Sequence, residues 1–260
     1  MSIKTRIYND FFRPSKEEDY EIILKTAKEN GYEFHTQLSF LEVLKNGLDP
    51  QKNYLILRRD VDTADYVILR KMLCLEKKYG ARATYYFRWN TMNLELMNDI
   101  NKSGGEASYH YEEIATFCYR NHIRSREQVL KKMEEIRDLF IVNIKKFREK
   151  TKQPCLTVAS HGDYVNSRLK IQNKELLNER VRLEAGVLFE AYDEPLASMI
   201  TCRLADQIEM NEFAAKAINA IEQQEPLILL LTHPRQWNSP VGVNLKENIN
   251  RFMKGIYMNL

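Results

Sequence analysis

A short apolar run that ends in two acids constrains the fold of this chain more than any other stretch. Tyr54 to Leu57 are apolar, two arginines follow, and Asp60 and Asp62 come next, just before a helix-like segment. Because strand side chains alternate between two faces, a strand here would place both carboxylates on the same side of the backbone. Such a pair suits metal binding and proton transfer, although an Asp near the start of a helix can also serve only as its cap.

The overall composition is that of a globular protein. Its 260 residues suffice for one large α/β domain or two small ones, and either can bury a full core. Apolar residues make up 44% and charged residues 29%, which excludes a largely disordered chain. The net charge of +3 is small and the charges are mixed along the chain, so we expect no nucleic-acid partner.

The cysteines and the N-terminal residues indicate in which cellular compartment the protein is expected. The four cysteines are widely spaced and form no CxxC pair, so buried thiols are expected rather than a zinc ribbon. The N-terminal residues contain no apolar segment followed by a cleavage site, which predicts no secretory signal. No window contains the roughly 18 apolar residues that a membrane span needs. Together these features predict a cytoplasmic protein without a membrane span.

The chain between residues 54 and 87 has the pattern of a strand, a helix and a second strand. An apolar strand over 54–59 precedes an amphipathic helix over 64–78, and the run 83–87 is rich in β-forming residues. Two strands joined through a helix by short links form a βαβ unit, so the sheet should be parallel. Further strands are predicted over 106–110, 155–160 and 226–231, with 199–203 as another candidate.

Helices are expected to connect and flank these strands. They are predicted over 16–30, 39–45, 94–101, 125–150, 211–223 and 245–257. The region 165–198 has no clear pattern, and we assign it no topology. No internal repeat or linker is found, so residues 1–260 are predicted to form a single domain, with 1–50 as an N-terminal extension packed on its barrel.

Polar side chains with useful chemistry stand at the ends of four predicted strands. They are Asp60 and Asp62, His110, His161 with Asp163, and His233. Because ligands gather beyond the carboxyl ends of parallel strands, these side chains should converge. Three of the five histidines hold this position, whereas His35 and His122 have no such neighbours and are expected to be packing or surface residues.

This set of side chains indicates metal-assisted hydrolysis. Neutral imidazoles and a carboxylate suit Zn2+ or a similar divalent ion, and three protein ligands leave a position open for water or substrate. Hydrolysis also needs a base and an acid, and Asp60 and His233 are available for these roles. The serine-hydrolase, Walker, dinucleotide-binding and HExxH motifs are absent from the sequence.

With these residues assembled, the stretch from Leu55 to Trp237 resembles the polysaccharide deacetylase superfamily, also called carbohydrate esterase family four. The matching motifs are RRDVDT at 58–63, GARATYYFR at 80–88, GGEASYHYE at 104–112 and LLLTHP at 229–234. The resemblance implies that Asp60 is the catalytic base, Asp62 a metal ligand and His233 the catalytic acid.

Two family motifs are altered in this chain. The family's second metal histidine has no counterpart, because Ile114 stands four residues after His110. The Arg-x-Pro-Tyr motif is also missing, and the sequence ASHGD, residues 159–163, takes its place. We therefore hypothesise that His161 replaces the lost metal ligand.

The expected site comprises three kinds of residue besides the base and the acid. The predicted metal ligands are Asp62, His110 and His161. Weaker candidates for the third ligand are Glu106 and Glu113. The residues expected to bind substrate or orient the catalytic groups are Arg59, Arg88 and Asp163.

The resemblance implies an α/β fold, a distorted (β/α) barrel of about seven parallel strands. It implies a metal-dependent hydrolase that removes an acyl group, with N-acetyl favoured, from a small-molecule or glycan substrate. The altered motifs look more like members of bacterial surface-glycan or sugar-nucleotide metabolism, such as lipopolysaccharide biosynthesis, than like secreted deacetylases. Two alternatives remain: a non-catalytic glycan-binding or biosynthetic accessory protein on the same fold, and a metal-dependent amidohydrolase of a non-sugar substrate.

Overall fold

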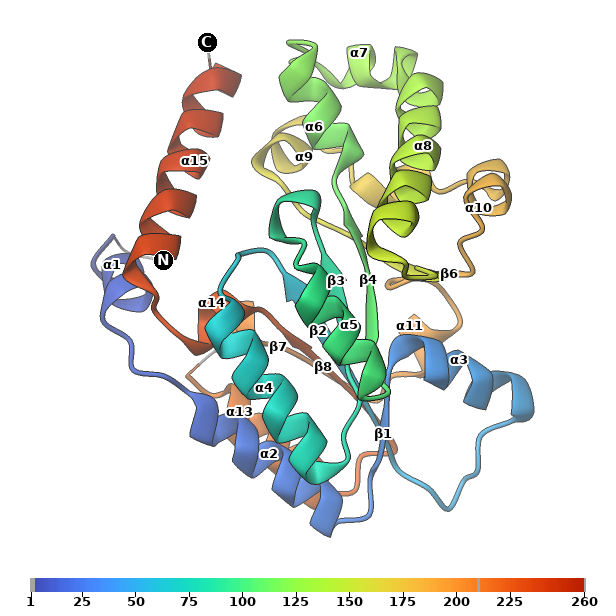
Figure 1. The fold of residues 1–260 in the computed structure, drawn as a ribbon, viewed down its shortest axis with the longest axis vertical. Coiled ribbons are helices and arrows are strands. Elements are labelled where there is room, and N and C mark those ends of the chain that lie inside the picture. The colour runs from blue at the N-terminus through green and yellow to red at the C-terminus, as the bar shows by residue number, and fades with distance from the viewer. Residues whose placement is uncertain (1–2, 210, 260) are drawn as a thin grey trace.

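The strand that carries the two acids runs through the middle of a curved parallel sheet (Figure 1). The computed structural model describes residues 3–209 and 211–259. In it, all eight residues of β2 (Tyr54–Val61) are buried. One edge of β2 pairs with β8, and the other pairs with β1 in its first half and with β3 in its second half. The apolar run is therefore covered on both faces and both edges, as expected for a central parallel strand.

The sheet is an incomplete barrel. Its strands follow the order β6-β5-β4-β3-β2-β8-β7, with β1 beside β2, and every pairing is parallel. The strands are β1 (Glu33–His35), β2 (Tyr54–Val61), β3 (Thr84–Phe87), β4 (Glu106–Tyr111), β5 (Thr157–Ser160), β6 (Phe189–Glu190), β7 (Cys202–Ala205) and β8 (Leu227–Thr232). The predicted distorted barrel of parallel strands is confirmed. Residues 1–50 do more than pack on it, because they supply β1.

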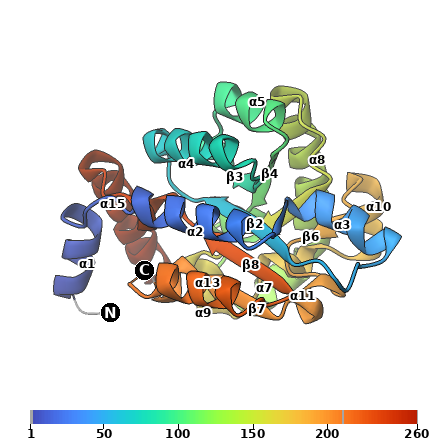
Figure 2. The ribbon, with the colours of Figure 1, turned by 90° about the horizontal axis from the view of Figure 1, so that it is seen from below.

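Helices cover the sheet and extend beyond it. In the first half they are α1 (Ile3–Phe11), α2 (Glu17–Glu29), α3 (Gln37–Asn46), α4 (Tyr66–Tyr79), η1 (Trp89–Thr91), α5 (Leu94–Lys102), α6 (Glu113–Arg120), α7 (Arg126–Lys131) and α8 (Met133–Thr151). In the second half they are α9 (Tyr164–Leu169), η2 (Asn173–Leu176), α10 (Glu179–Ala185), α11 (Leu196–Met199), α12 (Asp206–Glu209), α13 (Phe213–Glu222), α14 (Pro234–Trp237) and α15 (Val241–Asn259). Figure 2 shows α2 lying between α4 and α13. None of the helices in the described part of the chain is both long and apolar enough to cross a bilayer.

The differences from the predicted elements have local causes. The helix predicted over 125–150 is broken at Lys132 into α7 and α8. The unassigned region 165–198 is taken up by four short helical segments, α9, η2, α10 and α11, and the two-residue strand β6, which are too short to give a periodic pattern. Helix α4 is capped by Asp65, whose side chain accepts a hydrogen bond from the Ile68 backbone N–H at 3.4 Å. Asp60 and Asp62 are therefore not its caps.

Arg59 lies in the core, on the face of β2 opposite to Asp60. Its side chain is 1% exposed and donates hydrogen bonds to Glu76 at 2.6 Å and to the Tyr20 hydroxyl at 3.0 Å. A third bond reaches the Thr232 hydroxyl at 2.9 Å. The predicted substrate-binding role of Arg59 is wrong, because alternation along the strand turns it away from the acids.

The buried Arg59–Glu76 ion pair should contribute to the free energy of unfolding. Glu76→Ala would leave the Arg59 guanidinium buried without a carboxylate, and should lower the free energy of unfolding by about 3–5 kcal/mol. Urea denaturation measures the change. Arg180→Ala, which removes an exposed arginine paired with Glu184, is the control and should have little effect. An unfolding free energy unchanged by Glu76→Ala would contradict this account of the core.

Candidate active site

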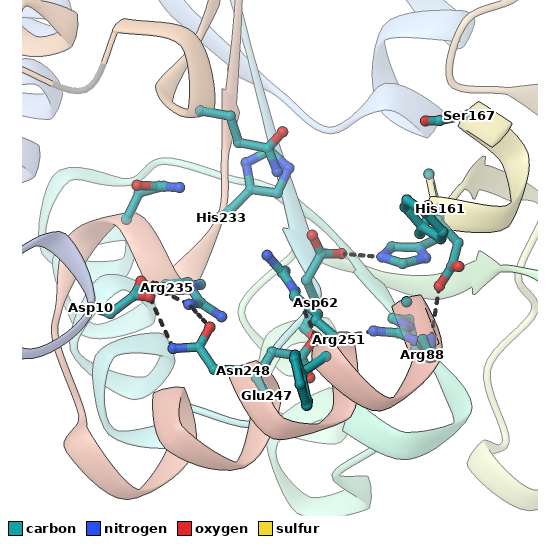
Figure 3. Close-up of a pocket in the computed structure, with 18 of the residues that line it drawn as sticks. Asp10, Asp62, Arg88, His161, Ser167, His233, Arg235, Glu247, Asn248 and Arg251 are labelled. Carbon is teal, nitrogen blue, oxygen red and sulfur yellow. Dashed lines mark hydrogen bonds and ion pairs between the residues drawn. The ribbon is translucent and has the colours of Figure 1, made fainter. Parts of the chain in front are cut away.

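A cavity of about 990 Å³ lies beyond the carboxyl ends of the central strands (Figure 3). Its lining includes five of the predicted site residues: Asp62, Arg88, His161, Asp163 and His233. Helices α1 and α15, from the two ends of the chain, supply much of the remaining wall. Asp60 and His110 are buried at 3% and 2% exposure and lie beside Asp62. The predicted convergence of strand ends is therefore present in the structure.

Asp60 is held by an arginine that the sequence analysis did not select. Arg58 donates from Nε and Nη2 to the two oxygens of Asp60, each at 2.8 Å. The guanidinium is itself fixed by the Tyr192 ring, whose centroid is 4.5 Å away. Burial raises the pKa of Asp60, but Arg58 and His110 outweigh it and hold this pKa below its usual value. Asp60 is therefore an oriented carboxylate.

Asp62, His110 and His161 come together around one carboxylate oxygen. Asp62 Oδ1 lies 3.2 Å from His110 Nε2 and 3.6 Å from His161 Nε2. This oxygen is buried and accepts no hydrogen bond from the described residues. Burial raises the pKa of Asp62, but the two imidazoles and His233 hold it well below its usual value. Both imidazoles thus turn an Nε2 atom toward the same carboxylate oxygen.

Each of the two distances from Asp62 Oδ1 suits a pair of ligands on one divalent ion. Two donor atoms bound about 2.1 Å from a tetrahedral ion lie about 3.4 Å apart, close to both distances observed here. His110 Nδ1 lies 2.9 Å from the carbonyl oxygen of Ala159, which can only accept, so Nδ1 donates this bond and Nε2 is the atom available to an ion beside Asp62. The Nδ1 atom of His161 lies 3.4 Å from a Glu112 oxygen, which likewise turns Nε2 toward Asp62.

A second group of possible ligands adjoins the first. Glu112, His161 and Asp163 offer ligand atoms within 4.8 Å of one another. Glu112 already pairs with Arg88 at 2.6 Å, and Asp163 pairs with Lys254 at 2.7 Å. Each cation would have to be displaced before a metal could bind these acids. Asp62 has no arginine or lysine ion pair among the described residues, so no cation would have to be displaced from it.

His233 is the centre of a charge pair that sequence reasoning missed. Its Nδ1 donates to Asp206 Oδ1 at 2.6 Å, and its backbone N–H donates to Asp206 Oδ2. Trp237 Nε1 donates to the same carboxylate at 2.8 Å. Burial lowers the pKa of His233, but Asp206, with help from Asp62 and Asp60, raises it to about 9. The imidazole is therefore protonated at neutral pH and can act as an acid.

The remaining predicted residues lie at varying distances from this chemistry. Arg88 lines the cavity, and its guanidinium also donates to the backbone carbonyl of Asp62 at 3.3 Å. Asp163 caps α9 and holds Lys254 of α15, so it fixes the cavity wall. Glu106 accepts hydrogen bonds from Thr84 and Thr157 at the start of β4, far along the strand from His110.

Three other residues are placed away from the site. Glu113 bonds Tyr109 and Asn143 within the core, so neither Glu106 nor Glu113 serves as the third ligand in this arrangement. His35 packs against aromatic rings, and His122 is exposed, in agreement with their predicted roles.

No protein-family model matches the chain, and no curated protein matches it significantly. Several solved structures do resemble it. The deacetylase PplD of Streptococcus pyogenes, solved in complex with acetate, is 17% identical, with a TM-score of 0.45 over 71% of this chain and 74% of that one. BA3943 of Bacillus anthracis, a carbohydrate esterase family four pseudoenzyme, is 16% identical, with a TM-score of 0.39 over 78% of this chain and 63% of that one.

The peptidoglycan deacetylase PdaC of Bacillus subtilis is 15% identical, with a TM-score of 0.33 over 80% of this chain and 98% of that one. These are the kinds of protein that the motifs resemble. The roles proposed for individual residues rest on the geometry described above.

The Asp206 carboxylate should set the pH at which the His233 ring titrates. The His233 ring should titrate near pH 9, protonated below that value and neutral above it. Asp206→Asn removes the main charge that favours the protonated ring, so it should shift the midpoint toward the ordinary value of about 6.5. Histidine ring resonances in NMR report both midpoints.

Glu247→Gln is the matched control, because it removes another carboxylate from the cavity wall without touching Asp206. It should leave the midpoint of His233 nearly unchanged. A His233 ring that titrates near 6.5 in the wild type, or equally in Asp206→Asn, would contradict the charge pair.

Proposed function

We propose that this protein is a metal-dependent hydrolase that removes an acyl group, N-acetyl in the first instance, from a sugar. The observation that carries the proposal is the unpaired, buried Asp62 Oδ1 facing the Nε2 atoms of two histidines. Asp62, His110 and His161 would hold the ion. A divalent ion there would polarise the acyl carbonyl and make water a better nucleophile.

The base and the acid are supplied by Asp60 and His233. Asp60 accepts the proton of the attacking water, and Arg58 fixes the orientation of its carboxylate throughout. His233 donates its proton to the departing amine, since Asp206 keeps the imidazole charged at neutral pH. Arg88 lies beside the metal ligands, where its guanidinium can bind a substrate oxygen.

The cavity and the cysteines support the proposed substrate class and compartment. A volume of about 990 Å³ accommodates an acylated sugar with a further attached group. The four cysteines are free thiols, as in a reducing compartment. We therefore propose a glycan or sugar nucleotide of bacterial surface-glycan metabolism as the substrate, and the cytoplasm as the location.

Metal binding is the first test. The purified wild type should bind one divalent ion per chain, with Zn2+ favoured, and the double variant His110→Ala, His161→Ala should lose it. Titration calorimetry with Zn2+ and elemental analysis measure the stoichiometry. Glu112→Gln and Asp163→Asn are the controls and should retain the ion. Loss of the ion in these controls, with retention in the single variant His110→Ala, would place it in the neighbouring group of Glu112, His161 and Asp163 instead.

Acetate release tests the catalytic roles. The wild type should release acetate from N-acetylated sugars, and Asp60→Asn should lower the rate by about 10²–10⁴-fold while the metal content stays unchanged. The probes are N-acetylglucosamine oligomers and UDP-N-acetylglucosamine, with acetate measured enzymatically. Sugar binding without any acetate release by the metal-loaded wild type would instead favour the non-catalytic glycan-binding alternative.

A further inference from the structure

Helix α15 is docked on the protein by its polar side. Asn244 is fully buried and donates to the backbone carbonyl of Asp10, and Asn248 donates to the Asp10 side chain at 3.0 Å. Further along, Lys254 pairs with Asp163 at the cavity wall. Figure 3 shows Glu247, Asn248 and Arg251 of this helix at the cavity. An ordinary surface helix presents such residues to water instead.

The side of α15 turned away from the buried Asn244 exposes a stripe of large apolar residues, one of which, Phe252, also borders the cavity. Its members are Val241, Leu245, Ile249, Phe252, Met253 and Ile256, and they are 40–67% exposed. Their spacing of three and four residues places them on an arc about 120° wide along a helix about 28 Å long. No charged residue of the described helix falls within this arc. A stripe of this kind needs an apolar partner.

Helix α1 adds to the same surface. It contacts α15, and its Ile7 and Tyr8 are 47% and 53% exposed, while Phe12, directly after the helix, is 70% exposed. A large apolar side chain has a surface of about 150–250 Å². When this area is multiplied by the exposed fraction of each side chain named above, the total exposed apolar surface is on the order of 1,000 Å². A stable protein interface buries about 800 Å² on each partner. The two terminal helices therefore expose enough apolar surface for one.

We propose that the apolar stripe of α15, extended by α1, is the interface with a second copy of this chain. A two-fold contact places the same patch on both sides, so an uncharged patch is complementary to itself. Homodimer interfaces are also the more apolar kind. A helix that binds a bilayer would instead turn Lys and Arg toward anionic lipid. Of the three basic residues of the described helix, Lys254 and Arg251 are engaged by Asp163 and Glu247, which leaves the exposed Lys246 as the one that a lipid surface would use.

Solution mass tests the proposal. The wild-type chain at micromolar concentration should have twice the chain mass by light scattering after gel filtration. The double variant Leu245→Lys, Ile249→Lys should have the mass of one chain, because four lysines in a two-fold contact repel each other. Leu183→Lys is the control, since Leu183 is 83% exposed on α10, away from the stripe, and this variant should stay dimeric.

Circular dichroism shows whether the lysine variant remains folded. If it does not, the double variant Leu245→Ser, Ile249→Ser is used in its place. A monomeric wild type, or a dimer that persists in the folded variant, overturns the proposal. A wild-type monomer that floats with phosphatidylglycerol vesicles overturns it in favour of a lipid surface. The proposed dimer does not depend on the proposed hydrolysis, so either can fail alone.

Discussion

Strand β2 carries a buried arginine on each of its two faces, and each guanidinium requires a carboxylate partner where water is excluded. On the outer face Arg59 pairs with Glu76 of α4 and ties the strand to its covering helix. On the inner face Arg58 pairs with Asp60, two residues along the same strand. The alternation that separates the two arginines also places Asp62 on the inner face. The geometry of the site thus follows from the course of one strand.

Charge pairing then decides which acid is available to a metal. Asp60, Glu112 and Asp163 each accept hydrogen bonds from an arginine or a lysine. Asp62 instead faces the Nε2 atoms of His110 and His161, and imidazole is a metal ligand in its neutral form. The inner end of the sheet therefore separates three acids held by cations from one acid suited to an ion. In the proposed site, this separation leaves Asp62 available to an ion although Ile114 stands where the motif that the sequence resembles has its second histidine.

Much of this arrangement was predictable from local patterns, and the rest depends on distant contacts. Apolar runs and strand-end polar residues predicted the parallel sheet and the convergence of His110, His161 and His233, because both follow from periodicity. The same alternation places Arg58, and not Arg59, on the face of β2 that carries the two acids, so the choice of Arg58 was also predictable from the sequence. Asp206 had no such signal, since it meets His233 only through the pairing of β7 with β8.

The central claim is that Asp62, His110 and His161 share one divalent ion. A crystal structure of the zinc-loaded protein, with anomalous diffraction recorded at the zinc absorption edge, tests it most directly. The account predicts one strong anomalous peak within bonding distance of Asp62 Oδ1 and the Nε2 atoms of both histidines. A peak among Glu112, His161 and Asp163, or no peak at the carboxyl ends of the strands, would contradict it.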